Sequence, residues 1–148
     1  MSAPESPALL QEWAVLQGNI EQHERNALAV KIAAVLVFFA ALVFSVAETL
    51  VAALVTILWV QEALLRTFQA RLCRRILRVE ELLRGQSVGP AMQLHTEWTV
   101  GRKGVLGMIA EYAKSALRPT VAYPYVALLA LDLIFLGGAG AGLEMPPA

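Results

Sequence analysis

Residues 27–65 form an almost continuous apolar stretch in which polar side chains occur singly or in small groups. The stretch is about twice as long as the roughly 20 apolar residues that one helix needs to cross the hydrocarbon core of a bilayer. Polar residues gather at 45–49, so the pattern predicts two membrane helices, at 27–46 and 50–65, joined by a turn there. The polar interruptions are Lys31, Ser45, Glu48, Thr49, Thr56, Gln61 and Glu62.

A second apolar stretch covers residues 121–143, with Tyr123 and Tyr125 at its start, as in an aromatic belt at a membrane interface. Asp132 lies near its middle, where a carboxylate opposes insertion by about 2.5–3.5 kcal/mol. The surrounding Leu, Ile and Phe residues each favour insertion by about 0.3–0.6 kcal/mol at central positions, so the sum favours a third membrane helix. The alternative is a re-entrant or peripheral hairpin.

Apolar residues recur at spacings of three and four in the flanking segments, which is typical of one face of an amphipathic helix. Such stripes cover residues 9–20, 65–83 and 105–116, and 91–98 is apolar enough for a short helix. Nothing between residues 19 and 31 breaks a helix, so we expect the first stripe to continue directly into the first membrane helix. Residues 85–90 contain two glycines and a proline, which indicates a linker.

The sequence therefore predicts an all-α membrane protein with three transmembrane helices, an N-terminal hairpin plus a C-terminal span, and cytosolic amphipathic helices. We expect five consecutive parts. They are a cytosolic amphipathic helix at 1–26, the transmembrane hairpin at 27–65, a cytosolic basic helical segment at 66–118, the third transmembrane helix at 119–143 and a periplasmic tail at 144–148.

The charge distribution predicts which side of the membrane each segment occupies. The net charge is zero, but all 12 Lys and Arg residues lie within 25–31, 66–84 or 102–118. Under the positive-inside rule these segments are cytoplasmic, which leaves the N-terminus inside and the 45–49 turn and the C-terminus in the periplasm. The abundance of Ala, Leu and Arg favours a bacterium of high GC content, so the predicted location is a bacterial inner membrane. Residues 1–26 lack the pattern of a cleavable signal peptide, so we expect the first membrane helix to direct insertion.

Motifs for catalysis or metal binding are missing from the sequence. A single cysteine, Cys73, allows neither an intrachain disulfide nor a cysteine metal cluster. His23 and His95 lack the spacing of a helical metal pair and are interpreted as surface histidines. No Walker loop, GxSxG motif or Cys/His nucleophile pattern occurs. We therefore expect a protein that is not an enzyme and uses no cofactor.

Within the third predicted span, Asp132 is a candidate for an intramembrane polar contact with a partner chain, because no basic residue of this chain is expected at its depth. Proton or cation transport is a second possibility, and a protonated acid bonded to a neighbouring helix is a third. Gly138 and Gly142 form a GxxxG pair, which would allow close helix packing inside a membrane. A flexible glycine tail outside the membrane is the equal alternative.

A cluster of arginines follows the second predicted membrane helix. Its position beside the membrane favours binding to anionic lipid headgroups, at about 1 kcal/mol for each basic residue, over binding to nucleic acid. The positive-inside rule alone would also require such a cluster. The candidate headgroup residues are Arg66, Arg71, Arg74, Arg75 and Arg78.

These observations favour a small, non-enzymatic accessory or assembly subunit of a larger membrane complex. Its expected partners are other integral membrane subunits, itself as a homo-oligomer, and anionic lipids, but no nucleic acid. The alternative is a homo-oligomeric pore, such as a stress or defence effector, with Asp132 as the only candidate for a selectivity ring. A membrane enzyme acting on lipid would lack a catalytic constellation. The layout is loosely similar to small bacterial two-span effector modules of the SLATT type, with no shared motif, so no functional residue is carried over.

Overall fold

The computed structural model describes residues 5–85, 89–101 and 104–141, with side chains described at 7–85, 89–101 and 104–135. The described residues form an all-helical protein, as the sequence predicted. Its elements are α1 (Glu5–Val43), α2 (Glu48–Leu83), α3 (Leu94–Val100), α4 (Val105–Ala116) and α5 (Pro119–Ala141). The predicted tail at 144–148 lies outside the described residues.

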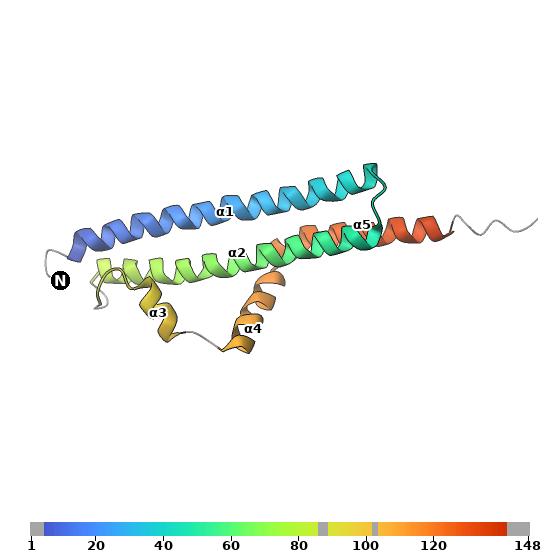
Figure 1. Ribbon diagram of the computed structural model, residues 1–148. Helices are drawn as coiled ribbons and strands as arrows, with labels where there is room; N and C mark the ends of the chain where they lie inside the picture. The colour runs from blue at the N-terminus through green and yellow to red at the C-terminus, as the bar shows by residue number, and fades with distance from the viewer. Residues whose placement is uncertain (1–4, 86–88, 102–103, 142–148) are drawn as a thin grey trace, which may run out of the picture.

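Helices α1 and α2 form a long antiparallel hairpin (Figure 1). α1 runs for 39 residues without a break, so its polar first half and its apolar second half form one rod. The turn occupies residues 44–47, slightly before the predicted 45–49, and Ser45 takes a left-handed conformation with φ of 50°. Glu48 therefore belongs to the first turn of α2, where a negative charge interacts favourably with the helix dipole.

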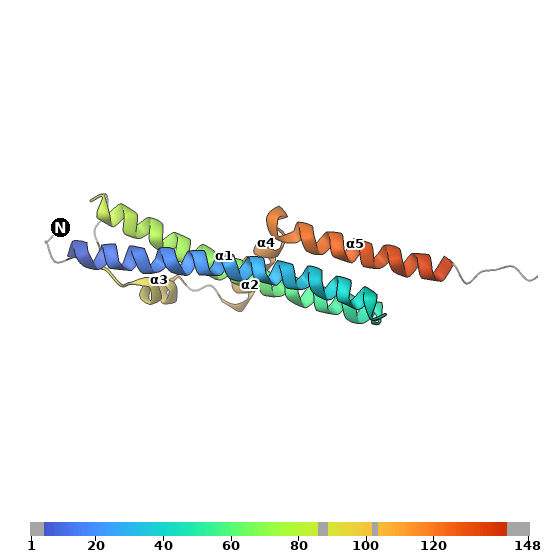
Figure 2. The same cartoon turned by 90° about the horizontal axis from the view of Figure 1, so that it is seen from above.

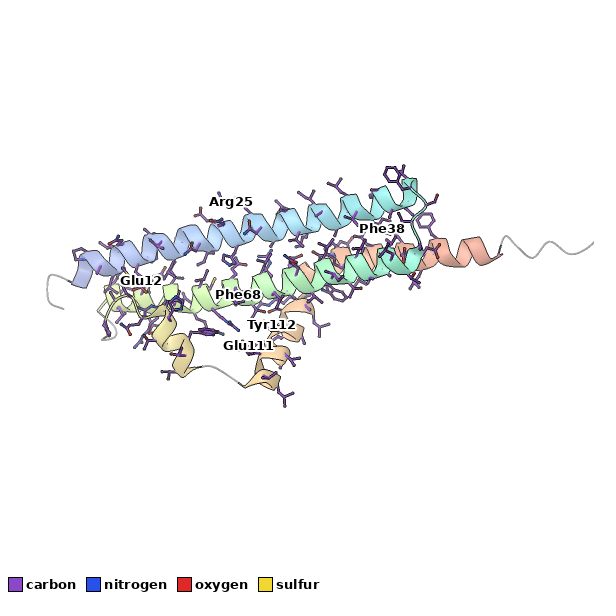
Figure 3. All side chains as sticks on the ribbon, in the orientation of Figure 1. Glu12, Arg25, Phe38, Phe68, Glu111 and Tyr112 are labelled. Carbon is purple, nitrogen blue, oxygen red and sulfur yellow. The ribbon has the colours of Figure 1, made fainter. Side chains whose placement is uncertain are left out.

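Two hydrophobic cores lie along the hairpin, one on each side of its centre. The core near the turn includes Phe38 of α1 and Val55 of α2, and both pack with Tyr125 and Leu128 of α5. Phe38 points from α1 towards α5 (Figure 3). The second core joins α1 and α2 at the other end of the hairpin. Its buried residues are Leu9, Leu16, Ile76, Val79 and Leu82.

Large apolar side chains cover the outer surface of the half of the hairpin next to the turn. Leu36 and Val43 of α1 and Ile57 of α2 are all more than half exposed. A helix pair that is apolar inside and outside fits a membrane rather than water. Both α1 and α2 contain a stretch long and apolar enough to cross a membrane, so the chain has the properties of a membrane protein.

Helix α4 and residues 119–135 of α5 meet at a bend of 72° and satisfy the same criteria for a membrane crossing as a pair. Two crossings are therefore supported directly, and a third depends on this bent pair. α4 lies across the hairpin axis, whereas α5 runs alongside the hairpin and extends beyond its turn (Figures 1 and 2). The predicted short helix at 91–98 begins later, as α3, and Pro119 begins α5.

The two faces of α4 differ in character. Ser115 is buried against α2, and Glu111 on the same face is ion-paired to Arg71 of α2. Ile109 and Leu117 each lie two residues from one of these positions, about 200° around the helix, and are 55% and 72% exposed. The apolar face of α4 thus points away from the charged contacts with α2.

Alanine substitutions at two glycines of the hairpin are expected to have opposite effects on stability. Gly85 follows the C-terminus of α2 with φ of +71°, a conformation that costs an alanine roughly 1 kcal/mol, whereas Gly18 lies inside α1. An added Cβ would meet nothing within 4 Å at either position, so backbone preference alone decides the result. We expect Gly85→Ala to destabilise the fold by about 1 kcal/mol and Gly18→Ala to stabilise it by about 0.5–1 kcal/mol. Thermal unfolding in one detergent checks both, and equal signs would contradict the prediction.

Candidate functional site

At the middle of the hairpin, a fully buried glutamate joins three helices. Tyr125 of α5 donates a hydrogen bond to Oε2 of Glu62 at 2.9 Å. Lys31 Nζ of α1 lies 3.2 Å from Glu62 Oε1, and Arg66 Nε lies 3.5 Å from the same oxygen. Lys31 also donates to the backbone oxygen of Thr120 at 2.7 Å. We call Lys31, Glu62, Arg66 and Tyr125 the central cluster, and it fixes the start of α5 against both arms of the hairpin.

Polar and aromatic contacts of α2 hold the junction of α4 and α5 beside the central cluster. The Trp59 ring stacks on Tyr125 with 6.2 Å between centroids, and its Nε1–H donates to the backbone oxygen of Ala116 at 3.1 Å. About two turns further along α2, the buried Thr67 hydroxyl lies 2.8 Å from the Ser115 hydroxyl. These contacts position the bend between α4 and α5 on one side of α2.

A second group of charges lies at the end of the hairpin distant from the turn. The side chain of Arg75 in α2 is 2% exposed and binds Glu12 of α1 through two parallel hydrogen bonds of 2.8 and 3.0 Å. It also donates to Glu97 of α3 at 2.6 Å, while the Met92 backbone N–H donates to Glu12 at 2.8 Å. We call Glu12, Arg75 and Glu97 the distal cluster, which ties α3 and the preceding loop to the hairpin.

The distal cluster favours the charged forms of its members. Burial alone would raise the pKa of Glu12, but the hydrogen bonds from Arg75 and from the Met92 N–H outweigh it, so this pKa lies below its usual value. Burial likewise opposes the charge on Arg75, and the two carboxylates reverse this effect and raise its pKa. The buried pair of Glu12 and Arg75 is therefore held in its charged form, and together with Glu97 it connects three helices.

The five arginines predicted to meet lipid headgroups have different environments. Arg75 is buried in the distal cluster, so its assignment to headgroups is wrong for this fold. Arg66 belongs to the central cluster, and Arg71 is held by Glu111 and by the rings of Phe68 and Trp98. Arg78 is exposed and paired with Glu81. Of the five, Arg74 is exposed with no ion pair to the described residues.

Asp132 lies on the buried face of α5, in register with Val121, Tyr125 and Leu128, and is 8% exposed. Its position directs the carboxylate towards the hairpin of its own chain, which does not favour the predicted contact with a partner chain. Asp132 follows Tyr125 by seven residues, about 10 Å nearer the end that carries the hairpin turn. Within the described residues it has no ion pair or hydrogen bond.

The predicted glycine pair is only partly described. Gly138 lies in α5, whereas Gly142 lies outside the described residues, so the close packing expected of this pair stays a prediction.

His23 and His95, interpreted from the sequence as surface histidines, both line a small apolar cavity between α1, α2 and α3. The cavity measures about 250 Å³, and Phe68 and Trp98 form part of its wall. In the part of the chain that the structure describes, no three His, Cys, Asp or Glu side chains gather as a metal site would require. Cys73 is a half-buried free cysteine.

The pairing of Lys31 with Glu62 was missed by the sequence analysis, which noted the two residues only as polar interruptions of the apolar stretch, although a usable signal existed. Lys31 precedes the end of α1 by 12 residues, and Glu62 follows the start of α2 by 14 residues. Opposite charges at similar distances from a hairpin turn are brought to the same level by the antiparallel arrangement. Comparisons with family models, with curated proteins and with solved structures found no match to this chain.

Proposed function

We propose that this protein is a small, non-enzymatic accessory or assembly subunit of a larger complex in a bacterial inner membrane. The observation that carries the proposal is the inward orientation of the charged groups in the apolar segments. Glu62 is fully buried, Asp132 is 8% exposed, and Lys31 is bound to Glu62 and to α5. The outward surface of these segments is mainly aliphatic and aromatic, which suits contact with lipid and with other membrane helices.

The proposed topology has three crossings, with the N-terminus in the cytoplasm and the C-terminus in the periplasm. α5 has 23 residues, about 34 Å at 1.5 Å per residue, which is long enough for one crossing. The positive-inside distribution supports the orientation, because the turn region and the residues after Arg118 carry no Lys or Arg. In this topology α4 lies along the cytoplasmic surface with its apolar face, including Ile109 and Leu117, towards the lipid.

The same inward orientation counts against a homo-oligomeric pore. A conducting pore needs a polar face along at least one helix, and ionisable residues in membrane segments normally face that pathway. Here the ionisable groups of the central cluster face the helices of their own chain. Exposed polar residues on α2 near the turn end, such as Thr49 and Thr56, offer no continuous charged lining.

Purification from the native membrane in a mild detergent, followed by mass spectrometry and a native mass, tests the proposal. We expect a larger complex to co-purify in stoichiometric amounts, and an unrelated tagged membrane protein of similar size defines the background. Recovery of this chain alone, as a discrete multimer, would contradict the accessory role. Ion flux in liposomes that is lost in Asp132→Asn would then support the pore.

A further inference from the structure

The basic residues of the described chain fall into two groups. Six of them lie within ion-pair distance of a carboxylate, and these are Lys31, Arg66, Arg71, Arg75, Arg78 and Arg84. For Arg25, Arg74, Lys114 and Arg118, no acidic partner lies within that distance in the described residues. Arg25 lies on the outer side of α1, away from α2 (Figure 3). Three described basic residues without an acidic partner therefore remain, and these are Arg74, Lys114 and Arg118.

Arg74, Lys114 and Arg118 line one cleft between α2, α4 and the start of α5. The cleft measures about 180 Å³, and the buried hydroxyls of Thr67 and Ser115 form part of its wall. Its one acidic side chain, Glu111, is already paired with Arg71 at 3.6 Å. The cleft therefore presents three cations that have no ion pair within 4 Å among the described residues, together with Glu111 and two hydroxyl groups.

A neighbouring cleft extends this basic region along α5. It shares Ala70 and Arg118 with the first cleft and measures about 530 Å³. Arg66 and Thr120 lie in its wall, followed by Val121 at the start of the apolar face of α5. A ligand that enters both clefts would thus meet the three cations of the first cleft and then Arg66 and Thr120 beside the start of α5.

We propose that Arg74, Lys114 and Arg118 form a binding site for the phosphate group of an anionic phospholipid. Phosphate oxygens accept hydrogen bonds from guanidinium and ammonium groups, and Arg is well suited to bind them through two parallel bonds. The position of the cleft favours a lipid as the source of the phosphate, because α5, whose exposed apolar side chains include Tyr123 and Val126, begins directly after Arg118. A soluble phosphate ester shares the headgroup chemistry but has no acyl chain to pack on the exposed apolar side chains of α5.

The site differs from the arginine cluster that the sequence indicated. Four of those five arginines are held by acidic groups of the chain itself, while Lys114 and Arg118 come from α4 and from the bend before α5. The proposal is independent of the accessory role, because it concerns lipid bound to this chain alone.

Lipid retention in nanodiscs tests the site. The full-length protein is reconstituted in phosphatidylcholine with a minor fraction of phosphatidylglycerol, and bound lipid is measured by native mass spectrometry. We expect retained phosphatidylglycerol on the wild type. Each basic residue near an anionic surface contributes about fivefold in affinity, so Arg74→Gln, Lys114→Gln and Arg118→Gln together should weaken retention about a hundredfold. A normal circular dichroism spectrum establishes that the triple variant is folded.

The matched control removes three other basic charges, through Arg25→Gln, Arg78→Gln and Arg84→Gln. We expect it to retain phosphatidylglycerol as the wild type does, whereas an equal loss would overturn the site in favour of general charge attraction. Displacement of the lipid by glycerol 3-phosphate at similar concentration would overturn the lipid assignment in favour of a soluble ligand. If the triple variant loses the lipid but still co-purifies with partner proteins, the loss concerns the lipid site and not the accessory role.

Discussion

Replacing Arg75 with Ala is expected to lower the free energy of unfolding by about 3–5 kcal/mol, because the substitution strands a buried carboxylate. The Arg75 side chain is 2% exposed and that of Glu12 is 6% exposed, so water cannot replace the lost guanidinium. Glu97 would lose its contact as well, and α3 would lose its ion pair with α2. Thermal or chemical unfolding in detergent, followed by tryptophan fluorescence, measures the change.

Arg78→Ala is the matched control for this substitution. Arg78 lies one turn further along α2 and pairs with Glu81, but the two side chains are 44% and 49% exposed. Exposed pairs contribute at most about 1 kcal/mol, so the control should unfold nearly as the wild type does. Equal stabilities of the two variants would show that the distal cluster does not stabilise the fold.

The distal cluster also predicts how stability changes with pH. The folded-state pKa of Glu12 is lowered, so its contribution to stability is complete above the unfolded pKa of roughly 4.3 and is lost as the pH falls through the folded value. The wild type should therefore lose stability on acidification in this range. Arg75→Ala removes the largest of the contacts that lower this pKa and leaves only the Met92 N–H to oppose burial, so the variant should lose less stability on acidification than the wild type.

Replacing Glu62 with Ala is expected to release α5 from the hairpin at a cost of about 3–5 kcal/mol. The substitution leaves Lys31 and Arg66 without their shared carboxylate and removes the acceptor of the Tyr125 hydroxyl. Tyr125→Phe removes one hydrogen bond to a charged group and should cost less, about 1.5–3 kcal/mol. An SDS titration of the purified protein gives the free energies.

Trp59 reports the position of α5 directly, because its ring stacks on Tyr125 and its N–H binds Ala116. In a background with Trp13→Phe and Trp98→Phe, we expect the emission of Trp59 to change in Glu62→Ala. Gln61→Ala, at the exposed neighbouring position, should leave both emission and stability within about 0.5 kcal/mol of the background. Unchanged emission in Glu62→Ala would show that the central cluster does not hold α5.

Hydrophobic periodicity was enough to predict the all-α class, the continuous first helix and the position of the hairpin turn to within a few residues. It could not predict which arginines of α2 are buried. Charged residues alternate in sign along α2, so their pattern does not determine how the helix is rotated against α1. A local signal was nevertheless present at Arg75. It follows Leu72 by three residues and precedes Val79 by four, so it lies within the apolar stripe and needs a buried acidic partner. The identity of that partner, Glu12, 63 residues away, depends on the register of the two helices.

The environment of Asp132 shows the same limit. Its spacing from Tyr125 and Leu128 places it on their face of α5, and that much follows from the helical period alone. Its depth does not follow from the sequence, because α5 is displaced along the hairpin and extends past the turn (Figure 2). The bend before α5 sets this displacement through the contacts of Trp59 and Thr67, which no pattern in the sequence reveals.

The pairing of Lys31 with Glu62 has a consequence for biosynthesis. Each of these charges lies inside a predicted membrane helix, where an unpaired charge opposes insertion by up to about 2.5–3.5 kcal/mol on the translocon scale. The two residues are only 31 positions apart in the chain, whereas Tyr125 is synthesised 63 residues after Glu62. If the two arms of the hairpin enter the bilayer together, lysine and glutamate neutralise each other before the rest of the chain exists. α5 then docks last, onto a pair of helices that has already been inserted.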